Sequence, residues 1–430
     1  MWVIDPKQLE QAIHDLCDTS VTTWRPLKIR VQVDSELAWL AAQPNPYKGY
    51  WRDRNAQQVC YLGKMAELTD LDDLVVLEQR YPAARFYGGI AFDSSREQWP
   101  GFAPCQFVLP EIELRSTGNE YWLYLNNWQQ LSADERRQLL AQVFSTPPPL
   151  RWQACEFTLA QYHPTLERWH ALIAQCTHPS VLGDLPKVVF ARQSCYQSTT
   201  AFSALALFDI WQQQQPDNFA FFISSEANNS FFGVPPERLY LRCGQSLESE
   251  ALAGSCAASD DPITNQQLAD ELQLDRKNIH ENQLVVDAIH AALAPLCESI
   301  HIAPTRVLKQ RHVQHLCQPI QAILHPETND KTLLQALHPT PAVAGFPIAS
   351  AQRYIGCNES FERGWYAGAV GYLSAEQSEM SVAIRSAYQH HQQLTLFAGA
   401  GIVQGSNAES EWQELNQKIA TIQGLLDDHH

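Results

Sequence analysis

The chain has 430 residues, of which 45% are hydrophobic and 18% are charged, a globular composition long enough for one large or two moderate domains. Its formal net charge is −17, which argues against nucleic acid or an anionic membrane surface as a partner. No apolar run approaches the ~18 residues of a membrane-spanning helix. An anionic small substrate would need local positive charge or a metal ion to offset the overall field.

Cysteine usage indicates a reducing compartment. Eleven cysteines are scattered from Cys17 to Cys357, none of them in a C-x-x-C pair, and the segment 1–16 lacks the features of a signal peptide. Such thiols are typical of proteins that form no disulfides. We therefore expect a cytoplasmic protein.

The first part of the chain alternates short apolar runs with turn residues, a pattern that predicts strands. Helical patterns interrupt these runs at 68–81 and 132–145, and the Pro-rich STPPPLRWQ at 145–153 ends this part. No catalytic motif occurs here, so we assign 1–150 as a β-rich scaffold that packs onto a catalytic region, 151–428. The strands expected are 27–33, 58–65, 86–92, 105–114 and 119–127.

Beyond the break, helical and strand-like patterns are partly segregated along the chain, which favours an α+β fold over a doubly wound parallel sheet. Short turns between neighbouring strands favour antiparallel pairing. Helices are expected at 168–179, 201–215 and 264–296, after Pro347, and at 408–426. Strands are expected at 187–192, 218–225, 230–243, 246–255, 365–374, 380–388 and 394–403.

The segment 399–418, GAGIVQGSNAESEWQELNQK, joins three glycines to an acidic helix start. Ser406 and Glu409 fit a capping box. Glu411, Glu414 and Lys418 share a strip that is either a solvated flank or part of a site, and the helical wheel places Glu411 nearest the core. The apolar positions at spacings of 3 and 4 predict one buried stripe, formed by Trp412, Leu415, Ile419, Ile422 and Leu426.

The glycines do not indicate a nucleotide site. Gly399, Gly401 and Gly405 are spaced G-x-G-x-x-x-G, unlike the dinucleotide fingerprint, and no P-loop lysine follows. Glycines that let a small substrate approach backbone N–H groups fit better.

A second acid, Glu281, lies about one helical turn before apolar positions 284 and 285, so it can border the core or remain a solvated helix charge. Magnesium commonly takes one or two carboxylates, because water and substrate oxygens complete its octahedron. His312 and His315 have no third ligand or H-E-x-x-H pattern, so zinc is not indicated.

Ten short segments between residues 183 and 418 together resemble the chorismate-utilising enzymes, a family of anthranilate, aminodeoxychorismate, salicylate and isochorismate synthases. With the length and the first part of the chain included, the resemblance is greatest to isochorismate synthases of menaquinone biosynthesis. The segments are, in order, GDLPKVVFAR, FFGVPPERL, EALAGS, HENQLVV, VQHL, HPTPAVAG, GWYAGAVGYL, VAIRSA, FAGAGIV and EWQELNQK.

The resemblance implies two antiparallel sheets packed as a sandwich and surrounded by helices. It also implies dependence on Mg²⁺, with Glu281 and Glu414 as direct ligands and Glu411 close behind. Related salicylate synthases carry a further acid one turn before the first ligand, where this chain has Asn278, so we expect less negative charge near the metal.

Isochorismate formation adds water at C2 of chorismate while the C4 hydroxyl leaves, which requires a general base and a general acid. The resemblance assigns Lys187 as the base and Glu237 as the acid, whose pKa should be raised by burial or nearby anions. Ammonia-using relatives generally have glutamine in place of Lys187, and bacterial aminodeoxychorismate synthases have a lysine nucleophile in place of Ala253. Water is therefore the expected nucleophile, without an amidotransferase subunit.

The remaining positions are expected to bind chorismate. Strand alternation places Arg385 on the face opposite Met380 and Val382, and its guanidinium suits a carboxylate. The other residues that the resemblance assigns to substrate are Gly254, Ser255, His315, Tyr366, Gly399, Gly401 and Lys418.

The expected activity is that of an isomerase, isochorismate synthase. A salicylate synthase, which would also eliminate pyruvate, and a siderophore-pathway isochorismate synthase are alternatives at the same site. An anthranilate synthase component is disfavoured by Lys187. An inactive metabolite-binding protein is disfavoured because every motif acid and base is present.

Overall fold

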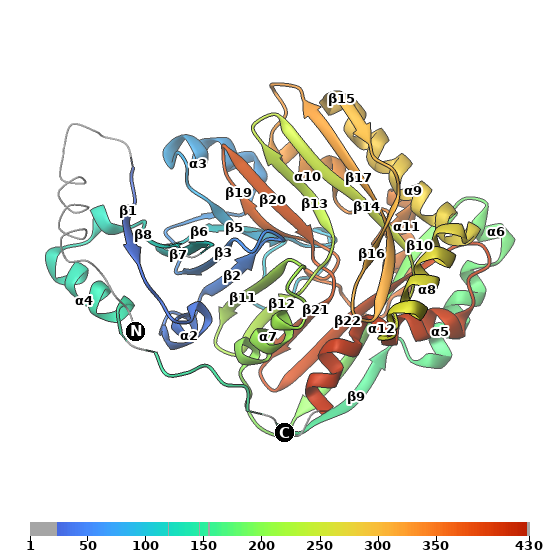
Figure 1. Cartoon of the computed structure of the whole chain (residues 1–430), viewed down its shortest axis with the longest axis horizontal. Helices are drawn as coiled ribbons and strands as arrows, with labels where there is room; N and C mark the ends of the chain where they lie inside the picture. Colours follow the sequence, from blue (N-terminus) through green and yellow to red (C-terminus); the bar gives the residue numbers. More distant parts are fainter. Residues whose placement is uncertain (1–23, 119, 146, 154, 428–430) are drawn as a thin grey trace.

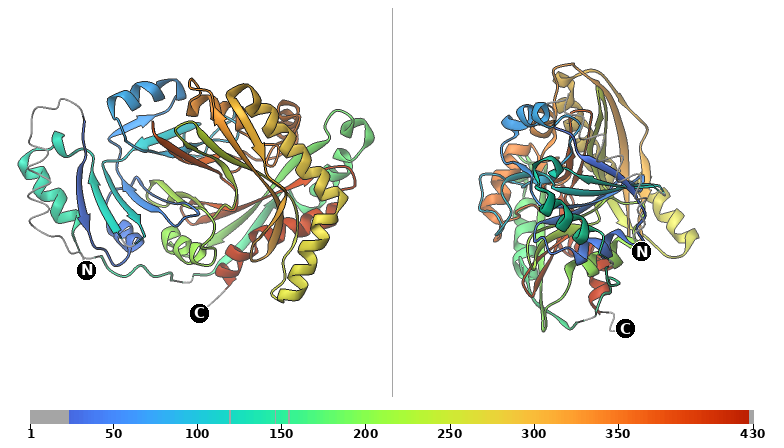
Figure 2. Two further views of the ribbon diagram at one scale, coloured as in Figure 1. Left: turned by 45° about the horizontal axis from the view of Figure 1, so that its top comes forward. Right: turned by 90° about the vertical axis from the view of Figure 1, so that its left-hand side faces the viewer.

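The computed structural model describes residues 24–427 except 119, 146 and 154, so the segment 1–16, expected not to be a signal peptide, lies outside the described residues. Two large sheets surround one continuous hydrophobic core, and helices lie mostly on the outside (Figures 1 and 2). No helix in the described part combines the length and apolarity needed to cross a bilayer.

The first sheet has twelve strands, paired antiparallel throughout. In sheet order they are β1 (Leu27–Val31), β8 (Glu120–Leu125), β7 (Ile112–Thr117), β3 (Gln58–Leu62), β2 (Lys48–Arg52), β11 (Ala220–Glu226), β12 (Asn229–Gly233), β21 (Ser386–His390), β22 (Gln393–Ile402), β10 (Lys187–Ser198) and β18 (Gly345–Phe346), with β9 (Phe157–His163) also beside β10.

The second sheet has ten strands and is also antiparallel. Because β2 pairs with β11 and β5 with β19, strands from both sides of the Pro-rich break share each sheet. In sheet order the strands are β15 (Cys297–Ile302), β17 (Val313–Leu324), β14 (Ser246–Ala257), β13 (Arg238–Cys243), β20 (Gln377–Val382), β19 (Ala369–Leu373), β5 (Phe86–Ile90), β6 (Cys105–Leu109) and β4 (Ala66–Leu68), with β16 (Arg306–Lys309) also beside β17.

Helices pack against strands of both sheets: α9 lies on β14 and β17, α11 on β10, and α12 on β22 (Figure 1). The predicted α+β class is confirmed. The α-helices are α2 (Glu36–Ala42), α3 (Leu74–Arg80), α4 (Ala133–Val143), α5 (Leu166–Cys176), α6 (Pro179–Leu182), α7 (Ala204–Gln213), α8 (Pro262–Leu274), α9 (Arg276–Leu293), α10 (Asp330–Leu337), α11 (Ile348–Asn358) and α12 (Ala408–Asp427), with short 3₁₀ turns at Leu71–Asp73, Trp128–Gln130 and Ala294–Leu296.

Two helix predictions are corrected by side-chain capping. The single helix expected at 264–296 is broken, because Asp275 ends α8 in an extended conformation and accepts the N–H of Asn278 to start α9. The start of α12 is capped by Asn407, whose Oδ1 accepts the N–H groups of Glu409 (3.0 Å) and Ser410 (3.2 Å). The predicted cap, Ser406, instead accepts the N–H of Val403 (3.2 Å).

Two strand predictions are also corrected, because the chain changes sheets inside them. The run expected at 230–243 divides into β12 of the first sheet and β13 of the second, and the run expected at 380–388 divides into β20 of the second and β21 of the first. The second break occurs beside Arg385, which has a φ of +47°. The direction of the Arg385 side chain therefore does not follow from the alternation of residues along a single strand.

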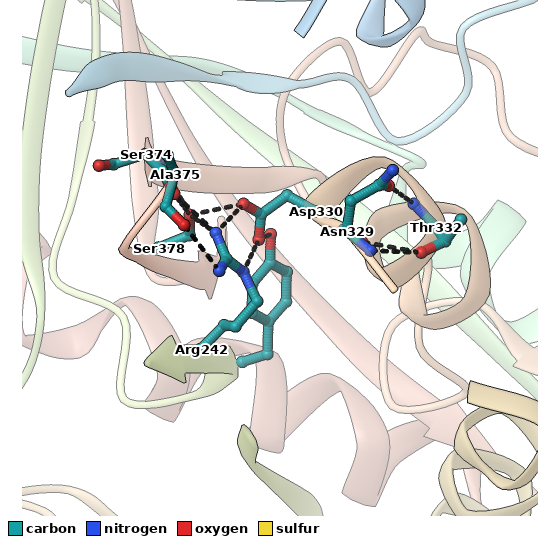
Figure 3. A network of polar contacts seen from close by, with 8 residues as sticks. Arg242, Asn329, Asp330, Thr332, Ser374, Ala375 and Ser378 are labelled. Atoms are coloured by element: carbon teal, nitrogen blue, oxygen red, sulfur yellow. Dashed lines mark hydrogen bonds and ion pairs between the residues drawn. The ribbon is translucent and has the colours of Figure 1, made fainter. Parts of the chain in front are cut away.

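A buried polar network ties the start of α10 to the second sheet (Figure 3). Asp330 accepts hydrogen bonds from Arg242 Nε (3.0 Å) and Nη2 (2.6 Å). It also accepts the hydroxyls of Ser378 (2.6 Å) and Tyr240 (2.9 Å). Arg242 Nη2 donates further to the carbonyl of Ser374 (2.6 Å), so the network joins β13, α10 and the turn between β19 and β20.

Candidate active site

The segment between β12 and β13 and the segment between β20 and β21, where the chain changes sheets, lie side by side and are joined by backbone hydrogen bonds. The N–H of Val234 donates to the carbonyl of Arg385 (2.9 Å), and the N–H of Val382 donates to the carbonyl of Glu237 (3.1 Å). These backbone bonds bring Glu237 and Arg385, which are far apart in sequence, to one place between the sheets.

A cavity opens at this place, bordered by β14, β22, α9 and α12. Lys187 and Glu411 are the two predicted site residues that do not line it. The predicted residues that do are Glu237, Gly254, Ser255, Glu281, His315, Tyr366, Arg385, Gly399, Gly401, Glu414 and Lys418.

Lys187, the first residue of β10, is completely buried just behind the cavity wall. Its Nζ lies 3.0 Å from Glu281 Oε1, and it has no acceptor in hydrogen-bonding geometry among the described residues. Gly401 of β22 pairs with Val189, two residues further along β10, and a Cβ added at Gly401 would lie 3.2 Å from Lys187 Cε and 2.5 Å from Glu281 Oε1. Glycine at this position lets the lysine and the carboxylate meet.

Glu237 is 1% exposed, and its Oε1 has no hydrogen-bond partner in the part of the chain that the structure describes. Burial raises the pKa of Glu237 to about 8, and the negative charge of Glu250 adds to this effect, against the positive charges of Lys187, Lys418 and Arg54. A raised pKa is the direction that a general acid requires.

Arg385 and His315 form a pair on one wall. Arg385 Nη2 lies 3.1 Å from His315 Nε2, and Arg385 Nη1 donates to the carbonyl of Lys418 (3.1 Å). Burial and the charges of Arg385 and Lys418 hold the pKa of His315 well below its usual range. Since a guanidinium only donates, the neutral imidazole accepts through Nε2. Burial lowers the pKa of Arg385 to about 10, so the guanidinium remains charged near neutrality.

Small residues leave room beside the opposite wall. Tyr366 stacks on Phe397 with ring centroids 4.8 Å apart, and a Cβ at Gly399 would lie 2.9 Å from the Tyr366 hydroxyl oxygen. Gly254 has a φ of +76°, and a Cβ there would lie 2.8 Å from the carbonyl oxygen of Asn278. Both glycines permit approaches that another residue would block.

The acids of α12 have different surroundings. Glu414 lines the cavity, with its Oε1 2.5 Å from Lys418 Nζ. Burial alone would raise its pKa, but the charge of Lys418 and hydrogen bonds from Lys418 and Ser255 lower it. Glu411 is 3% exposed and pairs with Lys277 of α9 (2.8 Å). The acid nearest the buried stripe is therefore not the acid that faces the cavity.

The donor set can be compared with the needs of a metal ion. Among the described residues, no three His, Cys, Asp or Glu side chains are grouped closely enough to hold one. Glu281 and Glu414 nevertheless line one cavity from two helices, and each is compensated by a lysine, Lys187 and Lys418 respectively. Two carboxylates fit Mg²⁺, which takes its other ligands from water and substrate oxygens.

Several apolar lining residues were not predicted. They form the wall on which a ring could pack, and all of them lie inside the sequence segments that carry the family resemblance, so those segments were the available signal. They are Val189, Leu252, Ala253, Ala342, Val343, Ile384, Phe397 and Ala398.

The fold and this cavity define a chorismate-binding enzyme. The family described as chorismate binding enzyme matches residues 54–427 of the chain. The chain therefore belongs to this family.

Individual relatives give a finer picture. Isochorismate synthase MenF of Escherichia coli (strain K12) is 35% identical over 398 residues, which cover 91% of this chain and 90% of the relative. Chloroplastic isochorismate synthase of Catharanthus roseus is 32% identical and covers 81% of this chain and 63% of the relative. The solved structure of MenF, the menaquinone-specific isochorismate synthase from Escherichia coli, has a TM-score of 0.85 at 33% identity and covers 98% of this chain and 99% of that chain.

The fold also occurs outside isochorismate synthases. Anthranilate synthase component I from Streptococcus pneumoniae has a TM-score of 0.68 at 21% identity, a likeness that shows the shared fold alone.

Proposed function

We propose that this protein is an isochorismate synthase, an isomerase that converts chorismate to isochorismate, and that it serves menaquinone biosynthesis. Its similarity to MenF over about nine-tenths of both chains supports the activity and the pathway. The observation that carries the chemistry is the burial of both Lys187, just behind the cavity wall, and Glu237, which lines the cavity and whose pKa burial raises to about 8.

In the proposed reaction, Lys187 takes a proton from water as the water oxygen bonds to C2 of chorismate. The two ring double bonds shift, the bond between C4 and its hydroxyl breaks, and Glu237 gives its proton to the departing oxygen, which leaves as water. One water is consumed and one is released, so the product is an isomer. Lys187 ends protonated and Glu237 ionised, and both must exchange protons with solvent before the next turnover.

Substrate carboxylates would be bound by fixed charge and by backbone. Arg385, oriented by neutral His315, would hold one carboxylate. Tyr366, Gly399 and Gly401 would form the adjoining wall, with Gly254 and Ser255 against the ring. This arrangement places positive charge where an otherwise acidic protein needs it.

Glu281 and Glu414 would hold Mg²⁺, with Glu411 behind them and paired to Lys277. When bound, Mg²⁺ would hold the C1 carboxylate and withdraw negative charge from the ring. Asn278 Oδ1 accepts the N–H of Ser255 (3.0 Å), so this position would add an amide and not a carboxylate near the metal site.

Water, not ammonia, is the proposed nucleophile, because a buried lysine occupies position 187 and Ala253 lacks a group that could form a covalent adduct. No amidotransferase subunit is therefore required. The described cysteines are all free thiols, which supports a cytoplasmic location.

The decisive experiment is incubation of the purified protein with chorismate and Mg²⁺, followed by chromatography of the products. Isochorismate as the sole product is expected. Salicylate with pyruvate would identify a salicylate synthase, and anthranilate formed with added ammonium would identify an ammonia-using enzyme; either result overturns the proposal.

The metal ligands are tested separately. Glu281→Gln and Glu414→Gln should each raise the Mg²⁺ concentration needed for half-maximal rate, with ~10-fold or greater effects typical of lost charge at a metal site. Glu409→Gln, an exposed acid at the start of the same helix α12, is the matched control. An unchanged Mg²⁺ requirement in both variants would contradict the assignment.

A further inference from the structure

Glu250 of β14 is a buried carboxylate that the proposed reaction does not use directly. It is 4% exposed and does not line the cavity. Glu248, two residues earlier in the same strand, has a side chain that is 48% exposed. A buried charge is normally paired or hydrogen-bonded. The groups that bond to Glu250 therefore indicate which part of the structure it stabilises.

Glu250 is connected to both peptide groups that flank Glu237. Its Oε1 accepts the backbone N–H of Arg238 (2.8 Å), in the peptide group after Glu237. Its Oε2 accepts Arg54 Nη2 (2.9 Å), and Arg54 Nη1 donates to the carbonyl of Pro236 (3.3 Å), in the peptide group before Glu237. One carboxylate and one guanidinium thus fix the backbone on either side of the candidate acid.

The backbone matters here because the Glu237 side chain has little else to orient it. Its Oε1 lacks a hydrogen-bond partner among the described residues. The carbonyl of Glu237 accepts the Ser381 hydroxyl (2.7 Å) and the N–H of Val382 (3.1 Å), which complete the grip on the main chain. The position of the carboxyl group therefore follows from how its own peptide groups are held.

We propose that Glu250 is a positioning residue for Glu237, acting through Arg54 and through the two peptide groups beside Glu237. The assignment rests on the proposed function, in which Glu237 is the proton donor. It extends that function to a pair of residues, Arg54 and Glu250, outside the substrate cavity.

The charges around Glu237 agree with this role. The groups that act on it are Glu250 of β14, Lys187 of β10, Lys418 of α12 and Arg54 of the turn after β2. Of these, Glu250 alone favours the protonated form, and its effect on the pKa of Glu237 is the largest after burial itself. Arg54 opposes it, so the two members of the pair have opposite electrostatic effects on the same carboxyl group.

Because Glu250 and Arg54 act on Glu237 in opposite senses, replacing each should shift the pH profile of activity in opposite directions. Glu250→Gln removes the anion and leaves the Arg54 cation uncompensated, which should move the loss of activity at high pH to lower pH by about one unit. Arg54→Met leaves the Glu250 anion uncompensated and should move this loss of activity to higher pH, by a smaller amount because Arg54 acts on Glu237 more weakly than Glu250 does. Both variants should lower kcat by ~10-fold with KM within twofold, because a misplaced donor affects the chemical step more than binding.

Glu248→Gln is the matched control, since it removes a carboxylate from the same strand at an exposed position. It should leave the pH profile unchanged. The epistasis experiment adds Glu250→Gln to Glu237→Gln, and the double variant should be no slower than Glu237→Gln alone. Equal rate losses in the two backgrounds, or matching pH profiles for the Glu250 and Glu248 variants, would overturn the proposal.

A readout without substrate separates this proposal from the assignment of function. The carboxyl stretch of Glu237, isolated as the infrared difference between wild type and Glu237→Gln, should titrate at lower pH in Glu250→Gln and at higher pH in Arg54→Met. If wild type forms salicylate or anthranilate, the proposed function fails while this measurement still decides the role of Glu250. If the infrared midpoint stays fixed in both variants, Glu250 has no such role. Should one variant fail to fold, the other still gives a signed result.

Discussion

Lys187 Nζ lies 3.0 Å from Glu281 Oε1, in a buried ion pair that joins β10 to α9. The pair brings the candidate base and a candidate metal ligand into direct contact, although they are distant in sequence. A ligand that draws charge from Glu281 would therefore also change the environment of Lys187.

Replacing Lys187 with methionine should abolish water addition. The change keeps a similar volume but removes the proton acceptor, and loss of a general base typically costs about 10²–10⁴-fold in rate. The measurement is the rate of isochorismate formation by chromatography, with Mg²⁺ binding measured by calorimetry to show that the metal site persists. Lys309→Met, at an exposed lysine bonded to Gln266, is the control. Turnover at the wild-type rate in Lys187→Met would refute its role as base.

Activity should also fall as the pH rises above about 8, because Glu237 has its pKa raised to about 8 and must be protonated to donate. The profile of kcat/KM reports this group in the free enzyme. Glu237→Gln cannot donate and should lose activity across the whole range. If activity instead fell near the usual pKa of a glutamate, the prediction that burial raises the pKa of Glu237 would be contradicted.

The same ionisation affects stability with a definite sign. In the folded protein the pKa of Glu237 is about 8, well above the ordinary value of 4.5, so between these values the folded state binds more protons than the unfolded state. Its contribution to stability therefore decreases as the pH rises from about 4.5 to 8. Glu237→Gln, which cannot ionise, should gain thermal stability relative to wild type as the pH is raised from 6 to about 9. A difference in melting temperature that does not change over this range would contradict the prediction.

Periodicity in the sequence identified the buried stripe of α12 correctly, since Trp412, Leu415, Ile419, Ile422 and Leu426 are all buried. It could not choose between Glu411 and Glu414. A helical wheel reports closeness to the core, whereas a ligand must reach a cavity, and that depends on where α9 and β22 lie. Glu411 is closed off by Lys277 of α9, while Glu414 faces open space.

Strand alternation does not account for the burial of Glu250 or for the direction of Arg385. Glu248 and Glu250 have the same phase in β14, yet one is exposed and the other buried, because the strand enters the interior between them. Arg385 lies beyond the end of β20 at a φ of +47°, so its side chain follows the turn and not the strand. Both features depend on contacts between the sheets, which no local pattern contains. The family resemblance singled out Glu237 and Arg385 because it compares whole sequence segments and does not depend on the periodicity of a strand.

Gly399→Ala should impair substrate binding and should also destabilise the fold. The new Cβ would lie 2.9 Å from the Tyr366 hydroxyl oxygen and 3.3 Å from Val189 Cγ1. Tyr366 is buried and stacked on Phe397, so it has little freedom to move away. Overpacking of this kind costs about 1–3 kcal/mol, and we expect KM for chorismate to rise ~10-fold. Gly424→Ala in α12, where a Cβ meets nothing within 4 Å, should leave KM unchanged and slightly stabilise the helix. Equal KM values for the two variants would contradict the assignment of Gly399 to the cavity wall.

Asp330→Asn tests the buried network in Figure 3, which lies away from the cavity. The asparagine would leave Arg242 as an uncompensated cation, because its Nε and Nη2 both donate to Asp330. Breaking a buried pair on one side costs about 3–5 kcal/mol, so the free energy of unfolding should fall by that order. Asp134→Asn, in an ion pair with Arg137 whose side chains are each 78% exposed, should cost about 0–1 kcal/mol. Denaturant unfolding measures both, and kcat of the Asp330 variant at low temperature should stay near wild type. Comparable losses of stability in the two variants would show that the buried network contributes no more to the free energy of unfolding than a surface ion pair does.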